Sequence, residues 1–536
     1  MSMLSRPLIA ALLLGSGCGS VPEAGPAVSQ RPSSEWVHYG ADGRLLYRTT
    51  PTGDRIMDFS HAGYMGGGVA LPDVPVRRRV EPSADGDDTA AIQAAIDEVS
   101  AMPIQGGFRG AVLLAPGIFT VSETIRISAS GVVLRGSGSG ADGGPISTLR
   151  LTGEPRVGVA IRRAGGGPET APPGFVAAES FITDEYVPSG ASTFRVANAT
   201  GFQAGDVIQI RRPVTQAWIE FMEMDDLVRD GNPQTWLQAG STIDTERRIA
   251  AVSGNTLTLD VPLSDSYDST YLSPPGTAVT KIPPPARISQ SGVEHLHIEA
   301  PPMAISHTEP HFSALRINGE DLWARDLQIE ETMNSVGIGG RRITVQQVHI
   351  QREALSQGSS RPAKFAPNGS QILLDRCSVQ ADNIWFIATG ARNTGPIVVL
   401  NADFRGDGRA ESHQRWSTGM LYDNVRVPEG AIEFRNRGSM GSGHGWSMGW
   451  GVSWNSLAES YIVQHPPGAP NWLIGSIGEI QAAARPFDSS PDLPNGIIDS
   501  HGAPVTPGSL YLAQLRERLG PQALRNIGYD PDVVMD

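Results

Sequence analysis

Residues 293–298 read Val-Glu-His-Leu-His-Ile, and this spacing of apolar residues recurs down the second half of the chain. The last apolar positions of successive copies are separated by 31, 21, 29, 25 and 23 residues. Within each copy the apolar residues alternate as in a half-buried β-strand. A strand that returns at such intervals is typical of a solenoid, in which each rung buries its apolar side against the next. The sequence therefore predicts an all-β solenoid of stacked strands. The six copies are Val293-x-x-Leu296-x-Ile298, Ala324-x-x-Leu327-x-Ile329, Val345-x-x-Val348-x-Ile350, Leu374-x-x-Cys377-x-Val379, Val399-x-x-Ala402-x-Phe404 and Tyr422-x-x-Val425-x-Val427.

The composition favours a turn-rich β protein and argues against a nucleic-acid partner. The 536 residues include 62 Gly and 41 Pro, and aromatic residues make up only 6%. The formal net charge is -14 at pH 7, whereas nucleic-acid binding requires clustered Lys and Arg. Any site for an anionic ligand must therefore be a local basic patch.

The first residues predict export. Arg6 is followed by an apolar run over residues 8–14, which is too short to remain as a membrane helix, and by small residues before Cys18. Residues 1–18 are similar to a bacterial lipoprotein signal in which Cys18 carries the lipid, and an ordinary secretory signal is the alternative. Residues 19–35 read as a flexible tether. We expect a protein of the cell envelope, anchored in the outer membrane by that lipid, or an extracellular protein.

The folded chain is predicted to begin and end with helices around the rungs. Residues 36–154 hold the first rungs and an amphipathic helix that starts after Asp88 and plugs the open end of the solenoid. Residues 287–480 carry the main rungs. Residues 481–536 form a tail, and its helix over 509–519 packs on the last rungs and stops at a glycine.

Residues 155–286 lack the apolar repeat, and their sequence predicts an inserted antiparallel β subdomain. Between its predicted strands lies an aromatic stretch that includes Trp218, Phe221 and Trp236. Two interpretations stay open: these rings overhang the solenoid as a platform for a sugar, or they form the small core of the insert.

Segments of the N-terminal sequence resemble those of a known protein superfamily. Residues 86–97 (Gly-Asp-Asp-Thr-Ala-Ala-Ile-Gln-Ala-Ala-Ile-Asp), 116–121 (Pro-Gly-Ile-Phe-Thr-Val) and 132–136 (Val-Val-Leu-Arg-Gly) resemble the opening of pectate-lyase-superfamily proteins. Residues 411–416 and 441–446 look like parts of a secreted bacterial pectate-lyase-like subgroup. The resemblance implies a right-handed parallel β-helix. It implies less about the reaction, because the superfamily includes polysaccharide lyases, glycoside hydrolases, epimerases and phage tailspikes.

The segment Glu411-Ser412-His413-Gln414-Arg415-Trp416 is the main candidate for chemistry. In extended backbone His413 and Arg415 point to the same side, so a titratable base would lie beside a fixed cation. Trp416 is near enough to stack on a sugar ring. The alternative is a polar loop in which the arginine pairs with Glu411 or Asp407.

A glycine-rich segment, Gly441-Ser442-Gly443-His444-Gly445-Trp446, lies about one rung further on, so His413 and His444 are predicted to face one groove. Further substrate-binding candidates near rung turns are Glu411, Trp446, Lys364, Asn383 and Arg437. Cys377 stands at an inward position and reads as a buried apolar residue. No Cys/His spacing resembles a zinc site, and no other metal site is predicted.

The resemblance, together with the His/Arg segment, implies a polysaccharide lyase that cleaves a uronate-containing glycan by β-elimination. Such a reaction requires a cation near the carboxylate, a base and an acid. We assign His413 as the base, Arg415 as the neutralising cation and His444 as the auxiliary acid, and bound Ca²⁺ can replace the arginine. A glycoside hydrolase would instead use two carboxylates among Glu411, Asp423 and Glu433. A non-catalytic glycan-binding protein is the third hypothesis. The expected partner is a polysaccharide, and the chain is expected to be a monomer or a small homo-oligomer.

Overall fold

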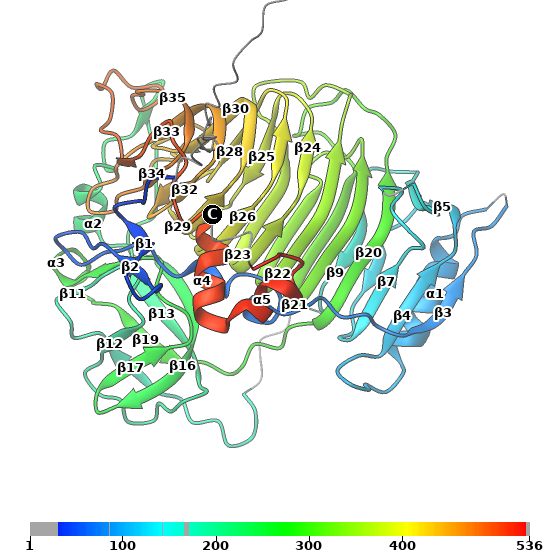
Figure 1. Cartoon of the computed structure of the whole chain (residues 1–536), viewed down its shortest axis with the longest axis horizontal. Coiled ribbons are helices and arrows are strands. Elements are labelled where there is room, and N and C mark those ends of the chain that lie inside the picture. Colours follow the sequence, from blue (N-terminus) through cyan, green and yellow to red (C-terminus); the bar gives the residue numbers. More distant parts are fainter. Residues whose placement is uncertain (1–30, 85, 142, 166–170, 532–536) are drawn as a thin grey trace, which may run out of the picture.

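The computed structural model describes residues 31–84, 86–141, 143–165 and 171–531. Figure 1 shows a long coil of stacked parallel strands, with a smaller β-rich unit beside one of its ends. The predicted signal over residues 1–18, Cys18 and most of the tether lie outside the described residues. Across those that are described, no helix is both long and apolar enough to cross a membrane.

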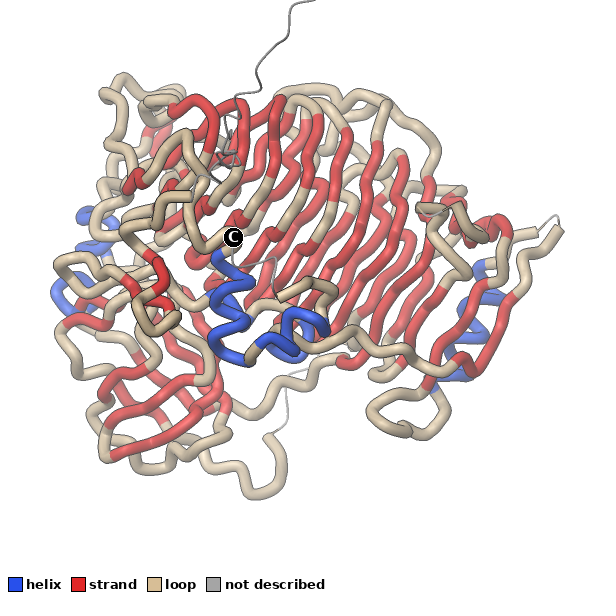
Figure 2. Tube along the Cα trace, in the orientation of Figure 1, coloured by secondary structure: helices blue, strands red, loops and turns tan. Residues whose placement is uncertain are grey.

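Within the described residues, 24 strands of the coil are joined by hydrogen bonds into one sheet, and neighbouring rungs pair in parallel. Figure 2 shows these strands side by side along the length of the molecule. The all-β solenoid predicted from the repeat is therefore present. Its strands are β3 (Val76–Val80), β4 (Gly110–Leu114), β5 (Gly117–Val121), β6 (Ile125–Ile127), β7 (Val132–Arg135), β8 (Ser147–Leu151), β9 (Val157–Ile161), β20 (Ser289–Glu299), β21 (Ser313–Glu330), β22 (Val336–Gln351), β23 (Ala363–Asp375), β24 (Ser378–Gln380), β25 (Ile384–Ala388), β26 (Thr394–Leu400), β27 (Asp403–Arg405), β28 (Gly408–Glu411), β29 (Ser417–Asp423), β30 (Arg426–Phe434), β31 (Met448–Gly449), β32 (Val452–Trp454), β33 (Leu457–Val463), β34 (Trp472–Ile474), β35 (Ile477–Ile480) and β36 (Ile497–Asp499).

Equivalent apolar positions of the repeat stack directly on one another. Val293 pairs with Ala324, and Ile298 with Ile329, and both columns continue through the following rungs. These side chains are fully buried in one core that runs along the inside of the coil. The repeat thus specifies the core, as the sequence indicated.

Each repeat contains a bend, which lies within one long strand in the first three copies and separates two strands in the last three. Its third residue is left-handed in all six copies, with φ between 49° and 57°. This residue turns the chain while the apolar residues on both sides keep pointing inward. Left-handed backbone is costly for most side chains, and Asn and Asp tolerate it best. Two of the six copies have Asn and one has Asp, and the series is His295, Asp326, Gln347, Arg376, Asn401 and Asn424.

Helix α1 (Thr89–Ser100) lies at the end of the coil remote from the β-rich unit (Figure 1). Its Ile92, Ile96 and Val99 are buried in the coil's core and pack near β3, β4, β6 and β7. Asp88 precedes the helix, but its carboxylate does not cap it. That carboxylate accepts hydrogen bonds from the backbone N–H groups of Ser83 and Thr120 instead.

The insert is an antiparallel unit, and it begins later than the sequence indicated. Strand β9 lies inside the range 155–286 that we assigned to the insert, yet it pairs with β6 and β21 of the coil. Six insert strands form one sheet in the order β10-β19-β13-β16-β17-β12. The elements are β10 (Glu179–Phe181), β11 (Tyr186–Val187), β12 (Thr193–Arg195), β13 (Val207–Pro213), α2 (Gln216–Phe221), β14 (Val228–Arg229), β15 (Asn232–Pro233), β16 (Thr242–Ser253), β17 (Thr256–Leu259), β18 (Tyr267–Asp268), α3 (Ser269–Leu272) and β19 (Ala278–Lys281).

The two ends of the described chain pack together along the side of the coil. The N-terminal segment contains β1 (Val37–Tyr39), β2 (Leu45–Tyr47) and the 3₁₀ turns η1 (Phe59–His61) and η2 (Tyr64–Gly66). It contacts α4 (Leu510–Leu519), which α5 (Pro521–Asn526) follows. The α4 helix begins after Ser509, whose hydroxyl accepts from the N–H of Leu512, and ends at Gly520, as predicted. It packs against the side of the coil at β29 and not only on the last rungs, because Asp423 accepts from Ser509 and Tyr511.

Candidate active site

A cleft of about 740 Å³ crosses the outer face of four neighbouring strands, β25, β28, β30 and β33, and reaches Gln481 just beyond β35. These strands lie along the upper edge of the coil in Figure 1, close to the insert. Residues 359–361 form part of one wall, and the loop over residues 435–444 forms part of another. Arg229 of the insert and Phe487 of the C-terminal segment complete the lining. The site is therefore assembled from segments that are far apart in sequence.

Strand alternation places two glutamates side by side in this cleft. Ala410 points into the core, so its neighbours Arg409 and Glu411 point outward. On the next strand Ile432 points inward and Glu433 outward. Glu411 and Glu433 are register partners on β28 and β30, so their backbones are about 4.8 Å apart. Both carboxyl groups are almost completely buried.

His413 forms a dyad with Glu411. Its Nδ1 lies 2.7 Å from Oε1 of Glu411. Nη1 of Arg437 lies 3.0 Å from the same Oε1 and donates at 2.7 Å to the carbonyl oxygen of His413. Nη1 of Arg437 also lies 2.8 Å from Nδ1 of His413. Because an ionised carboxylate can only accept a hydrogen bond, the 2.7 Å contact with Glu411 assigns the imidazole proton to Nδ1, which donates it to Glu411. This tautomer leaves Nε2 as a lone-pair acceptor, and no described residue forms a hydrogen bond with it.

The imidazole is also held by two rings. The ring of Trp385 lies edge-on at a centroid distance of 5.3 Å, and that of His444 at 5.1 Å. The guanidinium of Arg437 lies over the face of Trp385, 5.2 Å from its centroid. The side chain of His413 remains 23% exposed, so its ring is fixed in position but still accessible from the cleft.

Arginines dominate the charge of the cleft. Five guanidinium groups line it together with the two glutamates, and they belong to Arg229, Arg361, Arg409, Arg435 and Arg437. Nε of Arg409 lies 3.1 Å from Oε1 of Glu433, and Nη1 of Arg435 lies 3.4 Å from its Oε2. The cleft is thus a local basic patch on an acidic protein, of the kind that an anionic ligand requires.

The two glutamates have opposite pKa shifts. Burial alone would raise the pKa of Glu411, but the charge of Arg437 and the hydrogen bond from His413 outweigh it and hold that pKa below its usual value. Burial and the neighbouring charge of Glu411 raise the pKa of Glu433. Adjacent carboxyl groups whose pKa values move apart form an acid and base pair of the kind found in active sites.

Comparison with known proteins adds little to this geometry. No protein-family model matches the sequence, and no curated protein is significantly similar to it. The tailspike protein gp49 from Pseudomonas phage LKA1 is 14% identical, with a TM-score of 0.37 over 73% of this chain and 69% of that one. The catalytic domain of a GH87 alpha-1,3-glucanase is 8% identical, with a TM-score of 0.33 over 81% and 67%. The A-module of Azotobacter vinelandii mannuronan C-5 epimerase AlgE6 is 11% identical, with a TM-score of 0.26 over 83% and 98%. Likenesses this weak carry no argument about the activity of this chain.

Arg415 does not lie in the cleft beside His413. Its φ is 47° and that of Trp416 is 62°, so the backbone leaves the extended conformation on which the prediction depended. The Arg415 side chain donates instead to Gln414 and to the carbonyl and hydroxyl oxygens of Ser442. Arg437, predicted as a substrate-binding residue, is the cation that contacts His413.

His444 lies against His413, as predicted, but its environment does not suit an acid. Burial lowers the pKa of His444 to about 3, and the charge of Arg437 contributes to the shift. The imidazole is therefore neutral at neutral pH and lacks the acidic imidazolium proton that a general acid would donate to a leaving group. His444 instead packs against the ring of His413 and helps to hold it in position.

Trp416 and Trp446 are buried and cannot stack on a substrate. Both lie in a tryptophan cluster, defined here as Trp218, Trp236, Trp416, Trp446 and Trp450, that joins the insert to the coil. The indole N–H of Trp446 donates to the carbonyl of Met222 of the insert at 2.9 Å. The insert tryptophans thus form a core that they share with the coil. This result excludes the sugar platform for Trp218 and Trp236.

Two other predicted substrate-binding residues lie outside the cleft. Lys364 is fully buried, and its Nζ donates to the carbonyl of Thr332 at 2.7 Å. Burial lowers its pKa, so this amine is not a surface cation. Asn383 has a φ of 53° and donates to the carbonyl of Ser356 across a turn. Cys377 is buried, as predicted.

The residues that sequence analysis missed are Trp385, Arg409 and Arg435. Each of these residues follows or precedes an inward-pointing residue on a strand or just beyond one. Because side chains alternate across a strand, the sequence could have predicted that all three face outward. Glu433 was considered only as a hydrolase carboxylate. Its neighbour across the ladder, Glu411, becomes apparent only with the strand register.

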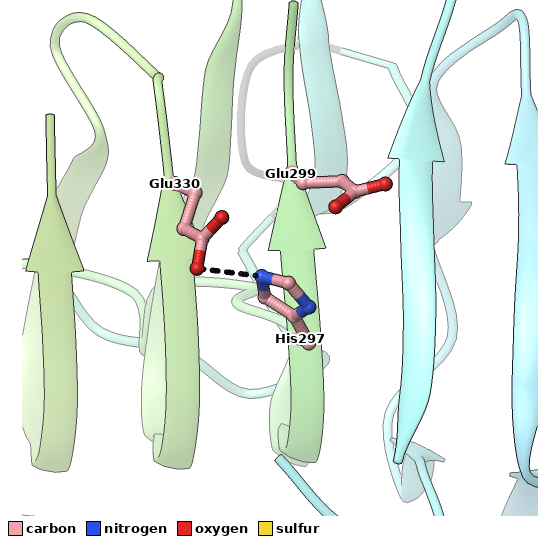
Figure 3. Close-up of side chains that lie close together, drawn as sticks. All are labelled: His297, Glu299 and Glu330. Carbon is pink, nitrogen blue, oxygen red and sulfur yellow. Dashed lines mark ion pairs between the residues drawn. The ribbon is translucent and has the colours of Figure 1, made fainter. Parts of the chain in front are cut away.

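A group of metal-ligand type lies elsewhere on the coil. His297, Glu299 and Glu330 bring their ligand atoms within 4.8 Å of one another on β20 and β21. Figure 3 shows Glu330 reaching toward His297 while Glu299 extends to the opposite side. Nε2 of His297 lies 3.4 Å from Oε1 of Glu330, and Glu299 pairs with Arg150. Because an arginine already neutralises Glu299, we interpret this group as surface ion pairs.

Proposed function

We propose that the protein is an enzyme that cleaves an acidic polysaccharide, and that it does so by β-elimination next to a uronate. The observation that carries this proposal is the oriented His413–Glu411 dyad in a cleft lined by arginines. The dyad supplies a base whose free Nε2 is accessible, and the arginines supply a place for a sugar carboxylate. The predicted leader supports a site of action outside the cytoplasm.

The residues of the cleft can account for each proton transfer of an elimination. Arg409 and Arg435 bind the uronate carboxylate, which acidifies the neighbouring C5–H bond. His413 Nε2 takes the C5 proton, the bond from C4 to the glycosidic oxygen breaks, and a C4=C5 double bond forms. Glu411 and Arg437 hold the imidazole in the required tautomer. Burial and the charge of Glu411 raise the pKa of Glu433, which favours its protonated form as the proton donor to the leaving oxygen.

A panel of polymers tests this proposal. Uronate-rich, sulfated and neutral polysaccharides are incubated with the protein, and the ultraviolet absorbance of the new C=C bond is followed together with the length of the products. We expect absorbance to rise and chains to shorten with a uronate polymer and not with a neutral one. Shortening of the neutral polymer alone would contradict the proposal.

Glycoside hydrolysis is the second candidate, because Glu411 and Glu433 have opposite pKa shifts on adjacent strands. Two structural features favour elimination over hydrolysis. The side chain of Glu411 is only 1% exposed, and its Oε1 is already engaged by Arg437 and His413, which hinders attack on a sugar. Both carboxyl groups also project from the same wall of the cleft. A hydrolase would generate new reducing ends without any gain in absorbance.

Replacing Glu433 by glutamine is expected to lower kcat by about 10²-fold, because the leaving oxygen loses its proton donor. The pH profile provides the second readout. An acid catalyst is active when protonated, so wild-type kcat is expected to fall as pH rises through the raised pKa of Glu433, and this limb should disappear in Glu433→Gln. Unchanged kcat and an unchanged profile would remove Glu433 from the mechanism.

Chelation is expected to leave the activity unchanged. The oxygens of Glu411 and Glu433 are paired with Arg437, Arg409 and Arg435, so these carboxylates are poor ligands for Ca²⁺ and the arginines take its place. The measurement is the initial rate with and without EDTA, followed by addition of Ca²⁺. A loss of rate that Ca²⁺ restores would show that the arginines do not suffice.

A further inference from the structure

A second basic region lies along the seam between the insert and the coil. Two adjoining cavities, of about 550 Å³ and 250 Å³, share the side chain of Arg392. The larger is bounded by residues 233–238 of the insert and by Arg415 and Ser442 of the coil. This seam groove shares no lining residue with the cleft, although the neighbours Gly441 and Ser442 line the cleft and the groove respectively.

Arg392 and Arg415 occupy matching places on neighbouring turns. Both are left-handed, with φ of 60° and 47°. The backbone N–H of Arg392 donates to the carbonyl of Arg415 at 3.1 Å, which sets the two residues one above the other. Two positive side chains therefore enter one groove from adjacent rungs.

Neither guanidinium has a carboxylate partner among the residues that the structure describes. Arg392 donates to the carbonyl of Thr242 and the hydroxyl of Ser241, at 3.3 and 3.2 Å. Arg415 donates only to Gln414 and Ser442. Burial and the neighbouring charge of Arg392 lower the pKa of Arg415, which shows that the two charges act on each other.

The positive charge of the groove comes mainly from Arg392 and Arg415. Its other two arginines, Arg287 and Arg341, lie near the carboxylates of Glu246 and Glu320, and Asp244 also lines the groove. Glu246 is neutralised by Arg287, which forms two hydrogen bonds with it, and by Arg341 at 3.0 Å. Two like charges side by side in a partly desolvated groove repel each other, and an anion between them would relieve that repulsion. Arginine pairs also offer the fork geometry that carboxylate and sulfate oxygens match.

We propose that Arg392 and Arg415, with Ser442, form a binding site for an anionic group of a glycan in the seam groove, outside the catalytic cleft. The group is a carboxylate or a sulfate ester, and the identity of the glycan as the enzyme's substrate rests on the proposed function. This site holds a second part of an acidic chain and takes no part in bond cleavage.

Equilibrium binding tests the site independently of activity. The probes are an oligogalacturonate, which carries only carboxylates, a sulfated dextran oligosaccharide, which carries only sulfates, and a neutral dextran oligosaccharide. The double variant Arg392→Gln/Arg415→Gln is expected to bind one charged probe at least about 10-fold more weakly than wild type. The probe that responds identifies the anion. Arg426→Gln, which changes an exposed arginine that lines neither region, serves as the matched control.

Further variants distinguish loss of this binding site from misfolding and from a failure of the catalytic proposal. The variant Arg392→Lys/Arg415→Lys retains the charges without the fork and should show an intermediate loss, even if the glutamine variant does not fold. The variant His413→Ala should bind as wild type does, so a failure of the catalytic proposal leaves this measurement intact. Wild-type affinity should fall as salt is raised. The site is excluded if the double variant and Arg426→Gln bind both charged probes equally, or if wild type binds neither at millimolar concentration.

Discussion

The variant His413→Ala is expected to lower kcat for depolymerisation by about 10²- to 10⁴-fold, which is the usual contribution of a general base. The reason is geometric: Nε2 of His413 is the accessible lone pair of the dyad, and Glu411 and Arg437 only orient it. Binding should change little, because the arginines that hold the carboxylate remain. The measurement combines kcat from product absorbance with affinity for an oligouronate.

A matched control is available in the same cleft. His307 also lines it but lies outside the dyad, so His307→Ala should retain most of the activity. Loss of affinity in His413→Ala with no chain cleavage in wild type would point to a glycan-binding protein instead. Equal activity of the two variants would exclude His413 as the base.

The variant Trp416→Ala is expected to reduce the free energy of unfolding by about 3–5 kcal/mol, as for large aromatic side chains removed from a core. The indole is 1% exposed and contacts Trp218, Trp236 and Trp450, so its removal opens a cavity where the insert meets the coil. Its N–H also donates to the buried carboxylate of Asp265, which would lose that partner. Denaturant unfolding followed by circular dichroism measures the change.

Trp385→Ala is the control for this prediction. Trp385 is partly exposed in the cleft, so its removal should affect affinity more than stability. If Trp416→Ala unfolded like wild type and lost only glycan affinity, the buried position of Trp416 would be wrong, and the sugar-stacking role suggested by the sequence would return.

The coil could be predicted from sequence because its apolar repeat is the physical cause of the fold. Val293, Ala324 and Val345 stack because each rung has no other way to bury its inner side. The bends were missed because their left-handed residue varies between Asn401, Gln347 and Arg376, so composition does not mark it.

The residues of the candidate site could be brought together only in part from sequence, because their arrangement depends on backbone turns and on strand register. Local sequence singled out His413 and Arg437, which line the cleft. Arg415 was misplaced because its left-handed backbone reverses the direction of its side chain. Trp416 looked like a surface ring because nothing in its own segment shows that the insert covers it. Glu433 reaches Glu411 only through the pairing of β28 with β30.

The most direct test of the central claim is product analysis in water enriched in heavy oxygen. Wild-type protein is incubated with a uronate polymer in this water, and the masses of the oligosaccharide ends are determined. Elimination by His413 predicts unsaturated products that gain no heavy oxygen beyond the slow exchange of their reducing ends, because no water is added to the cleaved bond. Saturated products that carry the label would show hydrolysis and contradict the proposed mechanism.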